Sequence, residues 1–317
     1  MRSDTERLIS FHAAQLRTWP AAAARYVELR NVRVREVTVD GFPVRLQFNP
    51  ARAVSTGAKT DAASIAARPC FLCKANRPAE QSVLELFPGM DTLVNPFPIF
   101  SRHFTLACRE HRHQDTVDFG RMAEVALSLP GLVTFYNGSA AGASAPDHLH
   151  LQAGEREFLP ICEMLEGDSG QLVKSTSGFN LFIPENLPFR ALHFVCTEAS
   201  SGTDPEMMLW MDTLLPVEPA TGQPLKGMRN VLMWPDREGC LHTLFLPRAA
   251  HRPSCYFKPE GDGRLMVSPG AVDMAGVIVL PRKEDFESVT RADIRRIYDE
   301  VSFPYMETEQ FKRLLLL

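Results

Sequence analysis

The sequence predicts a protein of the α+β class, in which helices pack on an antiparallel β-sheet. Residues 32–48 alternate between apolar and polar side chains on either side of Asp40-Gly41, a pair typical of a hairpin turn. Between residues 93 and 152 the patterns follow the order strand, strand, helix, strand, loop, strand, which favours an antiparallel sheet with a packed helix. The C-terminal half repeats this plan more loosely. These three observations together indicate the fold class.

Composition excludes several classes of protein. The chain has 317 residues, enough for one large domain or two ordinary ones. Hydrophobic residues make up 45% and charged residues 23%, values typical of a soluble globular protein. A net charge of −4 without a basic block argues against a nucleic-acid partner. No apolar run approaches the roughly 20 residues needed to cross a bilayer, so we expect no membrane partner.

Two features favour a cytoplasmic location. The first residues, Met1 to Arg7, carry charges where a signal peptide needs an apolar core. Of the seven cysteines, only Cys70 and Cys73 lie close together, and the scatter of the others fits a reducing compartment.

The N-terminal part is expected to hold a helix, a hairpin and a loop. Apolar residues at helical spacing predict a helix over residues 5–30. The hairpin at 32–48 follows it. Residues 49–59 are polar without a regular period, and we expect either an ordinary connection or a substrate-facing loop.

The next elements lead to the most informative motif. Residues 93–100 and 104–108 resemble consecutive strands, and residues 115–128 have the pattern of a helix with one apolar side. A strand at 132–136 then leads through a loop of small residues to a last strand at 147–152.

The second half is predicted from similar patterns. Glycines and prolines in residues 153–190 indicate a seam, so we divide the chain into 1–155, a connecting segment 156–190, and 191–317. The elements expected after the seam are a helix at 205–215, hairpin strands at 230–234 and 241–248, a buried strand at 277–280, a helix capped by Thr290 and Asp293, and a helix from about 307. The leucines that end the chain are expected to pack in the core or in a homodimer contact.

The segment His148-Leu149-His150-Leu151-Gln152 repeats with a period of two residues. On a strand this period places the two histidines and the glutamine on one face and the leucines on the other. The preceding small-residue loop lets backbone N–H groups approach a phosphate closely. The combination indicates a nucleophilic histidine beside a phosphate site. The alternative is a pair of histidines without a chemical role.

Cys70-Phe71-Leu72-Cys73 is a redox pair, part of a metal site, or two unpaired thiols. A redox motif usually opens a helix of a βαβ unit, and no such unit is expected here. A metal needs two further ligands, for which the sequence offers His103, His111, His113 and His148. A Cys₂His₂ set is a closed, structural zinc site.

Taken together, Cys70-x-x-Cys73, His111, Asn137-Gly138, Gly142-x-Ser144 and His148-x-His150-x-Gln152 resemble the transferase branch of the histidine-triad superfamily. That branch includes galactose-1-phosphate uridylyltransferase, diadenosine tetraphosphate phosphorylase and the GDP-hexose phosphorylases. The resemblance implies two histidine-triad-like halves, of which the C-terminal one is degenerate because it lacks a His-x-His-x-Gln pattern.

The resemblance also implies roles for individual residues. His150 is the expected nucleophile, forming a covalent nucleotidyl-histidine, and Gln152 is expected to donate its amide to a phosphoryl oxygen. A structural zinc is expected on Cys70, Cys73, His111 and His148, with His103 and His113 as alternatives to His111. The substrate is expected to contact Asn137, Gly138, Gly142, Ser144, Asn49 and Arg52. Arg248 and Arg282 lie at predicted strand ends, where they either meet substrate phosphates or are solvated.

The expected function is that of a nucleotidyltransferase or phosphorylase. Its substrates are a nucleoside diphosphate sugar or a dinucleoside polyphosphate, together with phosphate or a sugar phosphate. A hydrolase of the same compounds is one alternative, which Gln152 disfavours because the hydrolase branch has a third histidine there. A non-catalytic nucleotide-binding protein is another. The base, the sugar and the acceptor stay open.

Overall fold

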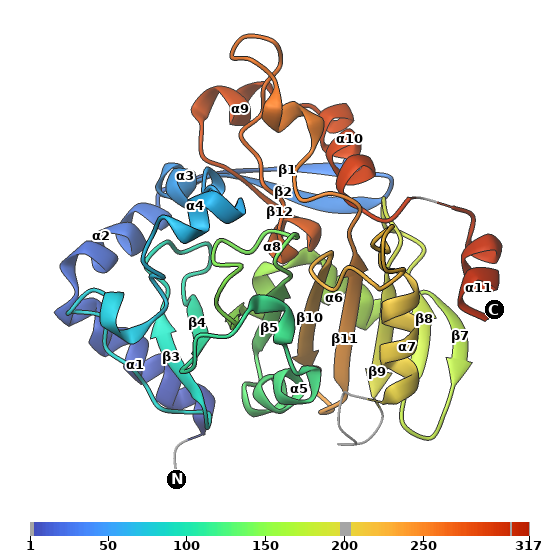
Figure 1. The fold of residues 1–317 in the computed structure, drawn as a ribbon, viewed down its shortest axis with the longest axis horizontal. Coiled ribbons are helices and arrows are strands. Elements are labelled where there is room, and N and C mark those ends of the chain that lie inside the picture. Colours follow the sequence, from blue (N-terminus) through green and yellow to red (C-terminus); the bar gives the residue numbers. More distant parts are fainter. Residues whose placement is uncertain (1–2, 197–203, 305, 317) are drawn as a thin grey trace.

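Two β-sheets organise the computed structural model, which describes residues 3–196, 204–304 and 306–316. Within these residues one sheet has nine strands and the other has three (Figure 1). The mixture of antiparallel strands and packed helices confirms the predicted α+β class.

The large sheet is antiparallel throughout and joins the N-terminal and C-terminal halves of the chain. Its strands, in spatial order, are β3 (Met90–Val94), β4 (Phe104–Cys108), β6 (His150–Glu155), β5 (Leu132–Asn137), β10 (Arg229–Pro235), β11 (Leu241–Pro247), β9 (Leu192–Cys196), β8 (Asn180–Ile183) and β7 (Gln171–Ser175). The halves meet where β5 pairs with β10, with Asn137 opposite Asn230. The division of the chain at 155 and 190 stays a prediction.

The small sheet brings distant parts of the chain together. The strands β1 (Arg33–Val39) and β2 (Phe42–Phe48) form the predicted hairpin, and Asp40 and Gly41 turn it with φ of 52° and 89°. The predicted strand β12 (Val277–Leu280) pairs with β2 and runs parallel to it. The strand β12 thus belongs to the small sheet and not to the large antiparallel sheet.

Each face of the large sheet is covered by its own layer. One face packs against α1 (Asp4–Thr18), α2 (Pro20–Leu29), α5 (Phe119–Ser128), α7 (Pro205–Thr213) and α11 (Thr308–Leu316). The other face packs against the small sheet with α6 (Pro160–Gly167), α8 (Ala271–Met274), α9 (Lys283–Ser288) and α10 (Arg291–Val301). In Figure 1 the small sheet, α9 and α10 lie above the large sheet.

Several predicted helices and strands are confirmed. The helix predicted at 115–128 is α5, which begins at Phe119 after its N-cap Asp118, and the hairpin of the second half is β10 and β11. Thr290 and Asp293 form the capping box that begins α10. In the last helix Leu315 is buried in the core. Leu317 lies outside the described residues.

Proline accounts for two wrong boundaries. The helix predicted over 5–30 is two helices, because Pro20 lacks an N–H and begins α2. The strand predicted over 93–100 ends at Val94, before Pro96 and Pro98.

Two segments predicted as irregular are more ordered than expected. Residues 49–59 contain the 3-10 turn Pro50–Arg52 and α3 (Ala53–Thr56), and α4 (Ala62–Ala66) follows them. The predicted connecting segment contains α6, β7 and β8. In the described part of the chain no helix combines the length and apolarity that a membrane crossing requires.

Candidate active site and metal centre

The His-x-His-x-Gln segment is not one continuous strand. Strand β6 begins at His150, and His148 lies in a bend before it. His150 and Gln152 do share a face of the large sheet. Gln152 lies opposite Phe135 on the neighbouring strand, and Phe135 packs in the core between the large and the small sheet, so this is the face that both residues occupy. The prediction that all three polar side chains share one strand face is therefore wrong for His148.

The imidazole of His150 has a defined tautomer. Its Nδ1 lies 2.8 Å from the backbone oxygen of His148. A carbonyl oxygen only accepts, so Nδ1 carries the proton and Nε2 presents a lone pair. Burial lowers the pKa of this ring to about 4, so the imidazole is neutral near pH 7. His150 is thus a neutral imidazole whose Nε2 has no partner among the described residues.

Gln152 is oriented by His103. The Nδ1 atom of His103 accepts from the backbone N–H of Ile99 at 3.3 Å, so its Nε2 carries the proton and donates to Gln152 Oε1 at 3.0 Å. Burial lowers the pKa of His103 to about 3. Because the amide oxygen of Gln152 is occupied, its N–H₂ group is the end left for another acceptor.

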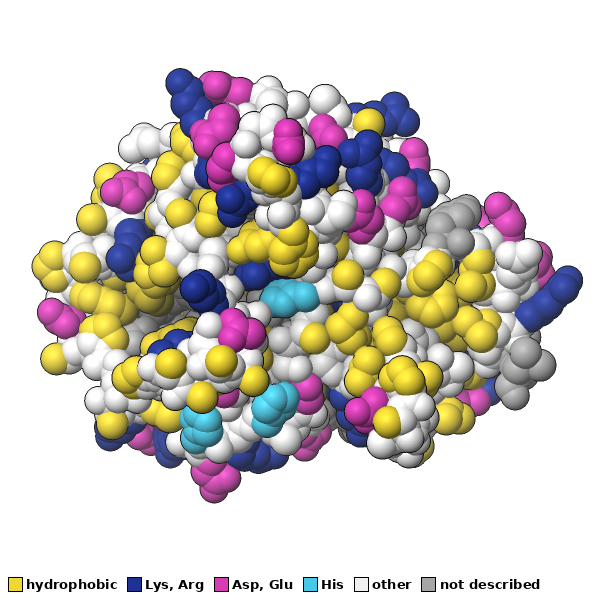
Figure 2. Space-filling view, turned by 45° about the horizontal axis from the view of Figure 1, so that its top comes forward, with side chains coloured by type: hydrophobic (Ala, Val, Ile, Leu, Met, Phe, Trp, Pro, Cys, Tyr) yellow, Lys and Arg dark blue, Asp and Glu magenta, His cyan; other side chains and the backbone are white. Residues whose placement is uncertain are grey.

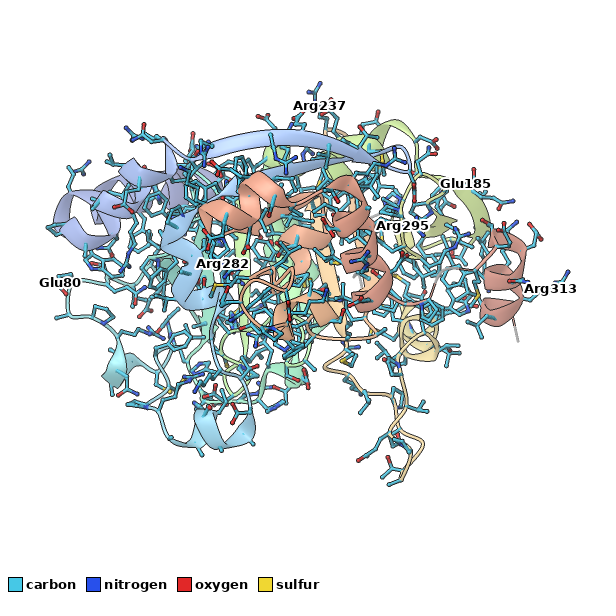
Figure 3. The ribbon with its side chains drawn as sticks, turned by 90° about the horizontal axis from the view of Figure 1, so that it is seen from above. Glu80, Glu185, Arg237, Arg282, Arg295 and Arg313 are labelled. Atoms are coloured by element: carbon cyan, nitrogen blue, oxygen red, sulfur yellow. The ribbon has the colours of Figure 1, made fainter. Side chains whose placement is uncertain are left out.

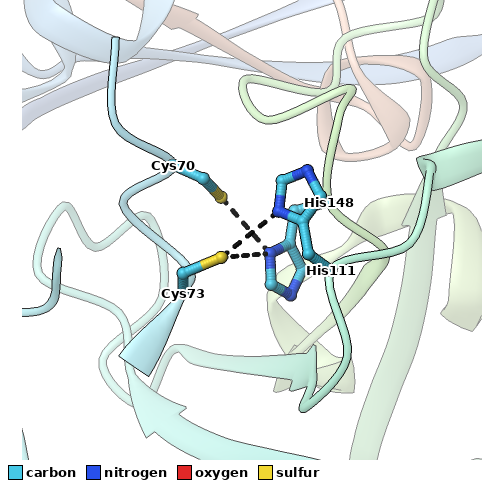
Figure 4. Close-up of side chains that lie close together, drawn as sticks. All are labelled: Cys70, Cys73, His111 and His148. Carbon is cyan, nitrogen blue, oxygen red and sulfur yellow. Dashed lines mark hydrogen bonds between the residues drawn. The ribbon is translucent and has the colours of Figure 1, made fainter. Parts of the chain in front are cut away.

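Cys70, Cys73, His111 and His148 form a candidate metal centre. One possible ligand atom from each lies within 4.8 Å of all the others. Cys70 Sγ is 3.2 Å from His148 Nδ1, and Cys73 Sγ is 3.2 Å from His111 Nδ1 (Figure 4). The set comes from three separate segments, as Figure 4 shows.

The surroundings decide which histidines belong to this centre. His148 Nε2 lies 2.7 Å from the carbonyl oxygen of Cys108, so it donates there and leaves Nδ1 free for a metal. His103 is occupied by Gln152, and His113 accepts from the backbone N–H of Asp115. Of the three alternatives left open by the sequence, His111 is the one in the cluster.

The glycines of the loop before His148 serve packing between backbones. A Cβ at Gly138 would lie 2.3 Å from the carbonyl oxygen of Gly227. Gly142 has φ of +96°, and a Cβ there would lie 2.6 Å from the Cα of Gly270. Among the described residues, the backbone N–H groups of Gly142, Ala143 and Ser144 have no hydrogen-bond partner. These three consecutive groups are available as donors to an anion.

Arg248 is fully occupied by the protein, whereas Asn137 is occupied only at its amide oxygen and keeps an amide N–H₂ group without a partner among the described residues. Asn137 Oδ1 accepts from Asn230 at 2.9 Å and from the backbone N–H of Ala271 at 2.7 Å. Arg248 is buried, and all five of its N–H donors are used. It donates to Asn230 Oδ1 and to the carbonyl oxygens of Pro269, Val301, Ala250 and His251. We therefore assign Arg248 to the framework of the site and not to substrate binding.

The two residues expected from the N-terminal loop differ. Asn49 is buried, and its amide N–H₂ group donates to Gln47 Oε1 and to the carbonyl oxygen of Pro98. Arg52 donates to the carbonyl oxygen of Phe97 at 2.8 Å, while its buried Nε has no partner in the described chain. Burial lowers the pKa of Arg52 to about 10, so it stays charged near pH 7. Arg52 keeps a donor for a ligand and Asn49 does not.

Arg282 is also occupied. It pairs with Asp285 at 2.6 Å and with Glu260 at 2.6 Å, and it is labelled in Figure 3. On the face shown in Figure 2, basic and acidic side chains are interspersed, without a broad basic area.

The register of the strand pairs shows which residues of the C-terminal half correspond to His150 and Gln152. Phe135 pairs with Gln152 in the first half and with Leu232 across the junction, and Leu232 pairs with Leu244. Leu244 thus takes the position of Gln152 in the second half. His242, two residues before Leu244, takes the position of His150. Both ring nitrogens of His242 have partners, since Nδ1 lies 2.9 Å from His193 Nε2 and Nε2 lies 3.3 Å from Asp236 Oδ2. The C-terminal half therefore has a leucine in place of Gln152 and a histidine without a free ring nitrogen in place of His150.

Sequence reasoning missed two residues that hold the site. Gln114 is fully buried and bonds the backbone of His150, and Asp115 accepts from Ser139. They follow His113 in a 3-10 turn, and no local pattern distinguishes them from an ordinary helix start.

Comparisons with known proteins give three results. The profile of a family described as "Domain of unknown function (DUF4922)" matches residues 11–155. No match is found among curated protein sequences. Solved structures of yeast Ap4A phosphorylase Apa2 match most of the chain, covering 91% of it and 98% of the yeast protein at 15% identity and a TM-score of 0.59.

The same yeast protein matches in two complexes. With AMP the TM-score is 0.60 at 17% identity and 93% coverage of this chain, and with Ap4A it is 0.55 at 17% and 91%. The chain therefore has the fold of this phosphorylase, and the expected resemblance to a diadenosine tetraphosphate phosphorylase is confirmed for the fold alone.

We expect Gly138→Ala to lower the free energy of unfolding by about 1–3 kcal/mol, because its Cβ forces two backbone segments apart. Gly167→Ala is the matched control, since a Cβ there has nothing within 4 Å and its φ is not positive. Urea denaturation of both variants measures the difference. Equal stability would show that the loop tolerates a wider spacing.

Proposed function

We propose that this protein is a nucleotidyltransferase or phosphorylase that transfers a nucleoside monophosphate through His150. Its substrate is a nucleoside diphosphate sugar or a dinucleoside polyphosphate, and the second substrate is phosphate or a sugar phosphate. The fold shared with the yeast phosphorylase supports this proposal. The observation that carries it is the tautomer of His150, which leaves the lone pair of Nε2 without a partner among the described residues, on the same strand face as Gln152.

The first step forms a covalent intermediate. The Nε2 lone pair attacks the α-phosphorus, the new N–P bond forms, and the bond from phosphorus to the bridging oxygen breaks. The leaving group departs with that oxygen as a sugar phosphate or nucleotide. The positive charge that the ring acquires is stabilised by the hydrogen bond from Nδ1 to the carbonyl oxygen of His148.

The second step releases the nucleotide. An oxygen of phosphate or sugar phosphate attacks the same phosphorus from the side that the leaving group vacated, and the N–P bond breaks. His150 returns to its neutral state. Phosphoryl-type transfer depends mainly on positioning and on stabilising the charge of the equatorial oxygens. Gln152 Nε2 and the N–H groups of Gly142 to Ser144 are the proposed donors, with Arg52 as a further contact to phosphate.

We assign zinc to the metal centre. Two thiols and two imidazole nitrogens are the donor set of a closed tetrahedral zinc site. Cys70, Cys73, His111 and His148 would hold the ion. A bound zinc would contribute rigidity, because it ties the segments that carry Cys70 and His111 to the residue that precedes the catalytic strand.

The test of function is the mass of the intact protein after incubation with GDP-, UDP- and ADP-sugars and with dinucleoside tetraphosphates. We expect a gain equal to one nucleoside monophosphate, located on His150 by peptide mapping. His150→Ala should bind nucleotide without gaining mass, since no neighbouring group replaces the lone pair. A wild-type protein that binds these nucleotides but is never labelled would favour a binding protein.

Gln152→Ala removes the proposed donor to the phosphoryl oxygen and keeps the proposed nucleophile. We expect the intermediate to form about 10²–10³-fold more slowly, because one donor to the developing negative charge is lost. Single-turnover labelling measures this rate. Labelling at the wild-type rate would remove Gln152 from the chemical step.

Metal analysis tests the zinc assignment. We expect about one zinc per chain and a lower melting temperature for Cys70→Ser, because metal binding is coupled to folding. Cys255→Ser is the control, since Cys255 is buried in the core between the two sheets and lies outside the metal cluster. A folded protein without metal, in which thiol reagents modify both Cys70 and Cys73, would contradict the assignment.

A further inference from the structure

Gln114 lies in the 3-10 turn Gln114–Thr116, between the metal centre and α5. It is three residues beyond the cluster residue His111, and its side chain is fully buried. A buried amide without a charged partner is unusual unless each of its polar atoms is bonded.

Every hydrogen-bonding group of this amide is used, and each bond goes to the backbone. Oε1 accepts from the N–H of His150 at 2.9 Å, and Nε2 donates to the carbonyl oxygen of His150 at 3.0 Å. Nε2 also donates to the carbonyl oxygen of Asn137 at 2.8 Å. The amide thereby bonds both backbone groups of the residue that carries the reactive nitrogen.

These bonds replace strand pairing at the point where it stops. The ladder between β5 and β6 ends at Phe135 and Gln152. Beyond it the two strands separate, with Asn137 at the end of one and His150 at the start of the other. Gln114 spans this gap and bonds both strand ends.

The residues around Gln114 hold the loop between these strands. Asp115 accepts from the backbone N–H and the hydroxyl of Ser139, at 3.0 and 2.6 Å. The N–H of Gln114 donates to the carbonyl oxygen of Pro146 at 3.1 Å, and Leu149 donates to that of Arg112. One short segment thus fixes the loop at both of its ends.

We infer that Gln114 is a positioning residue for His150, an inference that rests on the function proposed above. Within the part of the chain that the structure describes, the ring of His150 is bonded only to the backbone of His148, so the ring follows the backbone of its own segment. The placement of that backbone decides where Nε2 points. Gln114 touches no reacting atom and acts through the peptide groups of His150.

The chain provides a matched control in Gln15. Its amide is also buried, with Nε2 donating to the carbonyl oxygen of Glu80 and Oε1 accepting from the N–H of Ser82. Gln15 lies on α1, on the opposite face of the large sheet from Gln152. Substituting it removes comparable bonds without affecting His150.

The experiment compares Gln114→Met with Gln15→Met, in which an unbranched side chain of similar length replaces the amide. Gln114→Glu is a milder second variant, since a carboxyl group keeps an acceptor for the N–H of His150 and loses at least one donor. Three quantities are measured: the melting temperature, the dissociation constant of AMP, and the single-turnover rate of labelling by diadenosine tetraphosphate. Nitrogen NMR of the His150 ring reports its tautomer.

We expect both Met variants to lose stability and only Gln114→Met to lose about 10²-fold in labelling rate, with AMP affinity retained. Gln114→Glu should lie between wild type and Gln114→Met. The ring should be a single Nδ1–H tautomer in wild type and a mixture in Gln114→Met.

Wild-type labelling and a single tautomer in both Gln114 variants would overturn the inference. So would a labelling loss in Gln15→Met equal to that in Gln114→Met. If no nucleotide labels the wild-type protein, the proposed function fails, and the tautomer of His150 in Gln114→Met still decides whether Gln114 positions the ring.

Discussion

The separation of β5 from β6 is the constraint on which the rest of the site depends. Continued pairing would make His148 and His150 neighbours on one strand face, and both would serve the same side of the sheet. Because pairing stops at Phe135 and Gln152, the chain is free to form the small-residue loop and to turn His148 toward the cysteines. His150 stays on the sheet. One break in a hydrogen-bond ladder thus gives two histidines of the same motif different chemistry.

The three buried histidines of this region, His103, His148 and His150, share one hydrogen-bonding arrangement. Each has one ring nitrogen bonded to a backbone group, which fixes the tautomer and assigns the other nitrogen to a task. His148 donates from Nε2 and keeps Nδ1 for a metal, whereas His150 donates from Nδ1 and keeps Nε2 for phosphorus. His103 accepts at Nδ1 and so donates from Nε2 to the amide of Gln152. Burial holds His103 and His150 neutral near pH 7, so lone pairs and N–H donors carry the proposed chemistry.

The C-terminal half contributes a framework. Leu244 stands at the position that corresponds to Gln152, and His242, whose ring nitrogens contact His193 and Asp236, stands at that of His150. Arg248 donates to Asn230, which in turn donates to Asn137. The loop before the catalytic strand also lies against backbone of that half, at distances that admit no Cβ at Gly138. The second half therefore supports the loop from behind, through contacts that depend on backbone shape and on an arginine whose donors are all used.

The α+β class, both hairpins and the capped helix α10 follow from the sequence, because local periodicity and turn chemistry determine them. The motifs also predicted that Cys70 and Cys73 share a cluster with His148, and these three residues do lie together. Tertiary structure decided the rest. It chose His111 over His103 and His113, made Arg248 a framework residue, and placed Gln114 against His150. These outcomes depend on which backbone groups lie within hydrogen-bond distance after segments far apart in the chain have packed, and a short-range pattern of residue types contains no record of those distances.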